Sequence, residues 1–172
     1  LGQVIRGFPW PKSMRWGAGT LRWVRPLQSI LCLLSDEAGA EVVPFEIEGI
    51  VAADQTFGHR FMAPDPITVS GFDAYQSQLK RAYVMVDAAE RRAMIWNEAT
   101  IQAFALGLEV IEDPGLLTEV AGLVEWPVVL MGLIDPEFMD LPGEVLKTSM
   151  KEHQKFFSVR NPKTGKIERF IT

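Results

Sequence analysis

The sequence predicts an α+β fold, in which a mixed or antiparallel sheet packs with helices. Helix-period and β-branched segments are mixed along the chain without a regular strand–helix–strand alternation. The last residues form two β-rich runs around a turn. The 172 residues, 48% of them hydrophobic, suffice for a buried core. We therefore expect a single domain over residues 1–172.

Helical periodicity predicts several helices. The clearest spans 87–108, because Asp87 and Glu90 form a capping pattern like the S/T-x-x-E box. Residues 25–36 place apolar side chains at helical spacing after Pro26, which predicts an amphipathic helix. Further helices are expected within 71–87, at the start of 113–126 and over 142–153.

Alternation and β-branched residues predict the strands. We expect one strand or two short ones in 42–54, a loop over 55–66, a short strand at 67–70, a buried strand at 127–135, and two strands in 154–172 about a turn at 161–165.

Several chemistries have no signature in this sequence. It contains no G-x-x-x-x-G-K-[ST] loop, no G-x-G-x-x-G fingerprint and no G-x-S-x-G elbow. One cysteine, Cys32, and two histidines argue against a closed zinc site. A hydrolase could use His59 or His153 as the base, oriented by Asp54 or Glu125, but no spacing supports it.

The same composition bears on location. A lone cysteine excludes an internal disulfide and suits a reducing, cytoplasmic compartment. No apolar run approaches the roughly 20 residues that span a bilayer, so no membrane partner is expected. The first residue is Leu1 rather than methionine, and the last four read "RFIT". We expect a piece of a longer protein.

Charge is distributed unevenly along the chain. Residues 1–25 carry five basic and no acidic side chains, and 144–172 carry seven basic and three acidic ones. Residues 26–143 carry five basic and nineteen acidic side chains, within a total net charge of −5. Such polarity can steer a polyanion to one face, although basic termini also arise without a functional reason.

The segment "PWPKSMRWG", residues 9–17, combines cations and tryptophans on a proline-restricted backbone. It is consistent with nucleic-acid contact, in which a ring stacks on a base and cations bind the phosphates. The alternative is a tryptophan-anchored loop whose Lys12 and Arg15 lie across the rings as cation–π partners.

Two further groups have both a functional and a structural interpretation. In "TFGHRF", His59 and Arg60 can donate to phosphate, or His59 can cap backbone carbonyls while Phe57 and Phe61 anchor the core. In "KEHQKFF", His153 fits a helix C-terminus, or it forms a phosphate-contacting edge with Lys151 and Lys155.

Seven stretches together resemble a known family. They are "PKSMRWG", "RPLQSILCLL", "GHRF", "AERRAMI", "LVEWPVVLMGLID", "LPGEVLKTSMKEHQKFF" and "RFIT", in this order. Over nearly the whole chain they resemble the beta subunit of bacterial heterotetrameric glycyl-tRNA synthetase, of which this would be an internal fragment from the N-terminal half. Phe156-Phe157 and Ser149 depart slightly from the family pattern.

The resemblance implies an α+β module similar to the B3/B4-type domain of the phenylalanyl-tRNA synthetase beta subunit. It implies a role in tRNA binding or positioning for glycine–tRNA ligation, with ATP and magnesium used on the separate alpha subunit and no cofactor or catalytic residue here. Expected partners are glycine tRNA, the alpha subunit and the rest of beta. The alternatives are an inter-domain or inter-subunit scaffold and an editing-type hydrolase.

Residue charge and the resemblance together give the predicted contact residues for tRNA or a neighbouring subunit. They are Trp10, Lys12, Arg15, Trp16, Arg22, Arg25, His59, Arg60, Lys151, His153, Gln154 and Lys155.

Overall fold

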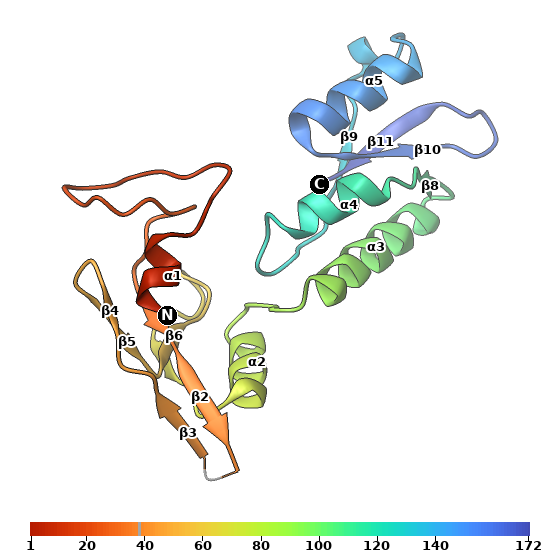
Figure 1. The fold of residues 1–172 in the computed structure, drawn as a ribbon. Helices are drawn as coiled ribbons and strands as arrows, with labels where there is room; N and C mark the ends of the chain where they lie inside the picture. The colour runs from red at the N-terminus through yellow and green to blue at the C-terminus, as the bar shows by residue number, and fades with distance from the viewer. Residues whose placement is uncertain (38) are drawn as a thin grey trace. The chain divides into compact units, whose positions relative to one another are not determined.

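The computed structural model describes residues 1–37 and 39–172. The chain forms two compact units, Leu1–Val84 and Met85–Thr172. Helices occur together with small antiparallel and mixed sheets, which confirms the predicted α+β class (Figure 1). The single domain over 1–172 and the resemblance to a B3/B4-type domain stay predictions.

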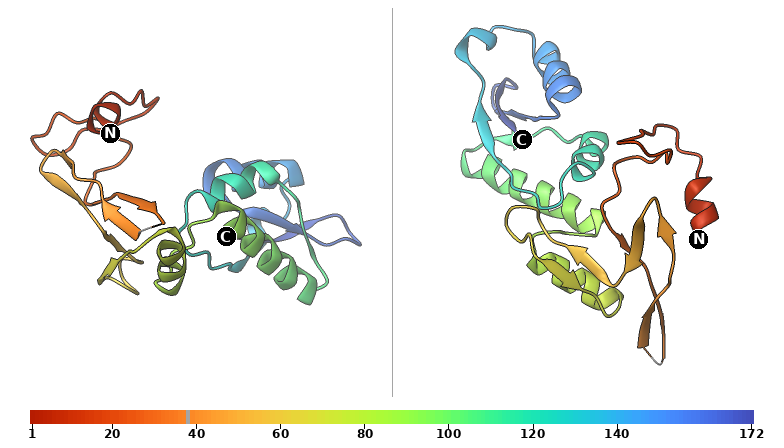
Figure 2. Two further views of the ribbon diagram at one scale, coloured as in Figure 1. Left: turned by 60° about the horizontal axis from the view of Figure 1, so that its bottom comes forward. Right: turned by 90° about the vertical axis from the view of Figure 1, so that its left-hand side faces the viewer.

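The first unit is built from short strands. Its elements are α1 (Gly2–Arg6), β1 (Ile30–Leu31), β2 (Leu33–Asp36), β3 (Gly39–Val42), β4 (Glu46–Ile47), β5 (Ile50–Ala53), β6 (Gln55–Phe57), β7 (Pro66–Thr68) and α2 (Phe72–Arg81). They form sheets in the orders β1-β5-β4, β2-β3 and β6-β7, and only the β1–β5 pair among these described strands is parallel. Residues 7–29 run between α1 and β1 as a long loop, in which Met14 and Trp23 form an isolated antiparallel bridge (Figure 2).

Residues 25–36 contain strands, so the helix predicted there is wrong. Ile30 pairs with Ala52, and β2 pairs with β3 in a hairpin. At the hairpin end, Gly39 has φ 141° and donates its N–H to Asp36 Oδ1 at 3.2 Å. An apolar run fits a strand as well as a helix, and here pairing with residues distant in sequence outweighs the helical spacing.

The segment 42–54 forms two short strands, one of the two predicted arrangements. β4 and β5 pair around Glu48 (φ 51°) and Gly49 (φ 83°). Two consecutive residues with positive φ are typical of a type I′ hairpin turn, whose twist matches that of the strands. The hairpin buries Ile47 completely.

The second unit combines helices with one antiparallel sheet. Its elements are α3 (Ala88–Ala105), β8 (Glu109–Val110), α4 (Pro114–Ala121), β9 (Met131–Leu133), the 3₁₀ turn η1 (Pro136–Phe138), α5 (Gly143–Ser149), the π-helical turn η2 (Met150–Gln154), β10 (Phe157–Arg160) and β11 (Ile167–Ile171). The strand order is β8-β10-β11-β9.

Aspartate side chains mark the starts of two helices in this unit. Asp87 accepts a hydrogen bond from Ala89 N at 2.7 Å, which confirms the predicted start of α3. Asp113 accepts from Leu116 N at 3.0 Å at the start of α4. The strand expected over 127–135 is shorter than predicted, and Val128 and Leu130 are exposed rather than buried.

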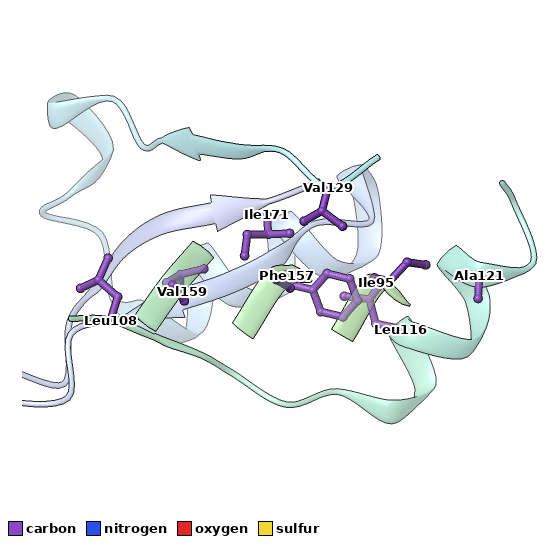
Figure 3. Packing of buried hydrophobic residues seen from close by; sticks show 10 residues of the cluster. Ile95, Leu108, Leu116, Ala121, Val129, Phe157, Val159 and Ile171 are labelled. Carbon is purple, nitrogen blue, oxygen red and sulfur yellow. The ribbon is translucent and has the colours of Figure 1, made fainter. Parts of the chain in front are cut away.

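The core of the second unit lies between α3, α4 and the sheet. Side chains from the helices and the strands are directed toward one another there (Figure 3). Ile95 of α3 and Leu116 of α4 meet Phe157 and Val159 of β10 in this cluster. A second cluster joins α5 and the π-helical turn to β11.

Candidate nucleic-acid interface

An aromatic cluster anchors the segment "PWPKSMRWG". The ring centroids of Phe8 and Trp10 are 4.5 Å apart, and Trp10 meets Trp23 edge-on at 4.8 Å. Met14 and Trp23 exchange two backbone hydrogen bonds of 2.8 and 3.2 Å. Trp10 therefore packs within the segment, and Trp23, which the sequence analysis did not single out, closes the loop 14–23.

The cations of residues 8–25, here called the N-terminal loop, lie on its surface. Lys12 and Arg15 are exposed, and within residues 1–37 and 39–84 the structure records no side-chain hydrogen bond, ion pair or cation–π contact for either. Arg22 Nε donates to Ser13 Oγ at 3.2 Å, and Arg25 donates to the carbonyl of Val24 at 3.3 Å. The rings fix the loop while the cationic side chains remain available to a ligand.

The loop after β6 is held at its base by a close backbone approach. A Cβ at Gly58 would lie 2.5 Å from Ala82 Cβ, so only glycine fits. His59 N donates to the carbonyl of Ala82 at 2.8 Å. The loop is thereby fixed to the C-terminal end of α2.

His59 organises the same loop with its side chain. Its Nδ1 accepts hydrogen bonds from the N–H groups of Phe61 and Met62, both at 3.3 Å. The expectation that His59 caps backbone groups of its own loop is therefore close to the structure. The difference is that the imidazole accepts from N–H groups and does not bind carbonyls. Because Nδ1 is occupied, a hydrolytic role would be restricted to Nε2 of His59.

Two phenylalanines of this loop are on the surface. Phe61 is 77% exposed and Phe57 is 49% exposed, so their interpretation as core anchors is wrong. Arg60 is exposed as well, with its guanidinium 5.1 Å from the centroid of the Phe61 ring. Sequence alone does not separate such a phenylalanine from a core residue.

Two cations of the C-terminal group, which consists of Lys151, His153, Gln154 and Lys155, are paired with carboxylates. Lys151 Nζ lies 2.7 Å from Asp113 Oδ2, and Lys155 Nζ lies 3.0 Å from Glu119 Oε1. Asp113 and Glu119, both on or next to α4, are absent from the predicted site. Their carboxylates compensate part of the positive charge that Lys151 and Lys155 present to a polyanion.

The ion pair between Asp113 and Lys151 shifts the pKa values of both side chains. A hydrogen bond from Lys151, assisted by one from Leu116 N, holds the pKa of Asp113 below its usual value of 3.8. The hydrogen bond to Asp113 likewise raises the pKa of Lys151 above 10.5. Both side chains are therefore charged across the physiological range.

A π-helical turn positions the remaining predicted residues of this group. His153 and Gln154 are exposed on the turn, which ends at Lys155 with φ 59°. The left-handed backbone conformation is unfavourable for a lysine. Here the hydrogen bond from Phe156 N to Met150 O (2.9 Å) spans Lys155 and stabilises the turn. Single π-helical turns occur often at functional sites.

The structure groups the predicted residues by unit. Trp10, Lys12, Arg15, Trp16, Arg22 and Arg25 belong to the N-terminal loop, and His59 and Arg60 to the loop after β6; Lys151, His153, Gln154 and Lys155 belong to the second unit.

Among the described residues, no three histidine, cysteine or carboxylate side chains are placed to hold a metal ion. Over the same residues, every helix is too short or too polar to cross a bilayer.

Comparison with known proteins gives a consistent result. The whole chain, residues 1–172, matches the family model described as glycyl-tRNA synthetase beta subunit. The chain is 70% identical over its full length to the glycine–tRNA ligase beta subunit of Ruegeria sp. (strain TM1040), and 69% identical to that of Paracoccus denitrificans (strain Pd 1222). It is 51% identical over 95% of its length to that of Phenylobacterium zucineum (strain HLK1). The chain spans about a quarter of the length of these relatives (25%, 25% and 24%).

Proposed function

The chain belongs to the glycyl-tRNA synthetase beta subunit family, and we propose that it is a tRNA-binding or tRNA-positioning module of a glycine–tRNA ligase. In this proposal the module acts within a cytoplasmic holoenzyme, together with the rest of beta and with an alpha subunit. ATP and magnesium are used on the alpha subunit, and the module itself supplies no catalytic residue.

One observation carries this proposal: Lys12 and Arg15 are exposed on a loop that its own aromatic residues hold in place, and within residues 1–37 and 39–84 no carboxylate pairs with either side chain. A cation with no carboxylate partner retains its full attraction for phosphate. A fixed loop also loses little conformational entropy when it binds. Arg22 and Arg25, whose hydrogen bonds go to neutral acceptors, extend the same cationic segment.

The second basic group contributes less in this proposal. Lys151 and Lys155 already bind Asp113 and Glu119, and a phosphate would have to compete with these carboxylates. His153 and Gln154 remain as exposed donors beside them. We therefore expect substitutions in this group to weaken tRNA binding less than substitutions in the N-terminal loop.

The test is the salt dependence of tRNA binding by the complete ligase. Each phosphate contact adds about 0.9 to the slope of log K against log salt concentration for double-stranded nucleic acid, and about 0.7 for single strands. Lys12→Ala combined with Arg15→Ala should lower the affinity for glycine tRNA and reduce the slope by about 1.4 to 1.8. Filter binding at several salt concentrations measures both quantities.

A matched variant separates local contact from net charge. Lys163→Ala with Lys166→Ala removes the same charge from the exposed turn of the β10–β11 hairpin. This control should leave the slope close to that of the unmodified ligase. If the loop variant and the control behave alike, the proposed contact at Lys12 and Arg15 is refuted.

A second candidate, an assembly scaffold, is favoured by exposed apolar side chains. Phe104 is 81% exposed, Leu34 is 70% exposed and Leu133 is 69% exposed. In this alternative, other segments of the beta subunit or the alpha subunit cover these side chains. On this alternative, Lys12→Ala with Arg15→Ala would leave tRNA binding unchanged but weaken the association of alpha with beta, as measured by sedimentation.

A further inference from the structure

We infer that Phe61 and Arg60 form a stacking platform for one unpaired nucleotide of the tRNA. This inference rests on the proposed function and assigns a ligand class to the tip of the loop after β6, which is separate from the N-terminal loop. The residues that carry it are Gly58, His59, Arg60 and Phe61.

The backbone of the loop is preorganised. The close approach of Gly58 to Ala82 and the 2.8 Å hydrogen bond from His59 N to Ala82 O fix its base. At the tip, His59 Nδ1 accepts from the N–H groups of Phe61 and Met62, and His59 O accepts from Ala63 N at 2.9 Å. The turn thus keeps its shape by internal hydrogen bonds, without needing a ligand.

Burial contributes little to the stability of the side chains at the tip. Phe61 is 77% exposed, and its ring lies 6.1 Å from the imidazole of His59. The Arg60 guanidinium lies 5.1 Å from the Phe61 centroid, and within residues 1–37 and 39–84 no carboxylate pairs with it. An aromatic ring and a guanidinium that has no carboxylate partner among these residues therefore lie together on a stiff turn.

This pair suits a nucleotide better than an apolar protein surface. A base can stack on the phenylalanine ring, and the adjacent guanidinium can bind the phosphate of the same nucleotide. Docking of a purely apolar partner would instead desolvate Arg60 without giving it a counter-ion. Stacking of this kind requires a base that is not paired in a helix, so the expected ligand is a single-stranded position of the tRNA.

Binding measurements on the complete ligase distinguish stacking from apolar packing. Loss of one base–aromatic stack costs roughly 1–3 kcal/mol, so Phe61→Ala should weaken binding of glycine tRNA by about 5- to 150-fold at constant salt. Phe61→Leu should weaken it nearly as much, whereas Phe61→Trp should preserve it. Arg60→Ala should reduce the salt slope by about 0.7. If Phe61→Leu binds as tightly as the unmodified ligase, the stacking inference is overturned.

Photo-crosslinking identifies the partner directly. With p-benzoylphenylalanine in place of Phe61 in the complete ligase, irradiation with glycine tRNA should give an adduct that ribonuclease shortens. An adduct to protein alone would overturn the inference in favour of an inter-domain contact. The proposed function is tested separately, because Lys12→Ala with Arg15→Ala must still reduce the salt slope even where every Phe61 variant is neutral.

Discussion

The ammonium group of Lys151 lies 2.7 Å from the carboxylate of Asp113, and that same carboxylate caps the first turn of α4. One side chain thereby ties the π-helical turn η2 to the N-terminus of a helix distant in sequence. The carboxylate is favoured there by the hydrogen bond from Leu116 N and by the positive end of the helix dipole. The pair links the motif "TSMKEHQKFF" to folding rather than to ligand contact alone.

The stability of the protein should depend on pH through this pair. Because the pKa of folded Asp113 lies below 3.8, its contribution is complete above that value and is lost as the pH falls through the folded pKa. Because the pKa of folded Lys151 lies above 10.5, its contribution is complete below that value and is lost as the pH rises through the folded pKa. Urea unfolding at a series of pH values measures both losses.

Asp113→Asn is the matching variant, since asparagine retains the cap but not the charge. It should be less stable than the unmodified protein near neutral pH. The difference should begin to shrink below about pH 3.8 and above about pH 10.5, and it should be lost only as the pH passes the lower folded pKa of Asp113 or the higher folded pKa of Lys151. A constant difference over the whole range would show that the ion pair does not contribute.

Arg91 should be a folding residue rather than a phosphate ligand. Its guanidinium donates to the carbonyls of Ala121 (2.8 Å), Val86 (2.8 Å) and Met85. Arg91→Met should therefore destabilise the protein by about 1.5–3 kcal/mol in chemical denaturation, because charged donors are lost from partly buried carbonyls. The neighbouring Arg92→Met should change stability by no more than about 0.5 kcal/mol. Equal effects at the two positions would contradict this role.

Gly132 should not tolerate a side chain. A Cβ there would lie 2.2 Å from Phe170 Cζ, and the Phe170 ring is stacked on Phe156 at 4.8 Å and 7°. Gly132→Ala should lower the free energy of unfolding by about 1–3 kcal/mol, since the ring must leave its packed position. Gly143→Ala is the control, because its nearest neighbour, Ile167 Cδ1, would be an ordinary 3.8 Å away. Thermal unfolding of the two variants compares them.

Gly58→Ala should disorganise the loop that carries Arg60 and Phe61. The new methyl group would collide with Ala82 Cβ at 2.5 Å and with Ala82 O at 2.8 Å. We expect a loss of about 1–3 kcal/mol in stability and weaker binding of glycine tRNA by the complete ligase. Adding Ala82→Gly removes the first collision but not the second, so the double variant should recover part of the stability. If the double variant is no more stable than Gly58→Ala, the collision with Ala82 Cβ is not the cause of the lost stability.

Local chemistry allowed several elements to be predicted correctly. Asp87 marks the start of α3 because a carboxylate accepts the free N–H groups of a first helical turn. The turn around 161–165 follows from its own residues, with Asn161 accepting from Lys163 N at 2.9 Å and Gly165 at φ 72°. The exposed cations Lys12 and Arg15 were also found from sequence, because no acidic residue lies within 1–25.

Other features depend on partners that are far away in the sequence. The strand at Ile30 exists through its pairing with Ala52, which helical spacing does not reveal. The pairing of Lys155 with Glu119 depends on the packing of α4 near the π-helical turn. The exposure of Phe61 depends on a turn that His59 closes.

By itself the sequence determined the family, the α+β class, the helix caps and the segregation of charge, because each of these is encoded in residue identity or in neighbours a few positions apart. Only the tertiary structure decided which cations are free, which phenylalanines are buried and where an apolar run becomes a strand. Those outcomes depend on contacts between distant segments, whose free energies exceed the weak local preferences of the residues involved.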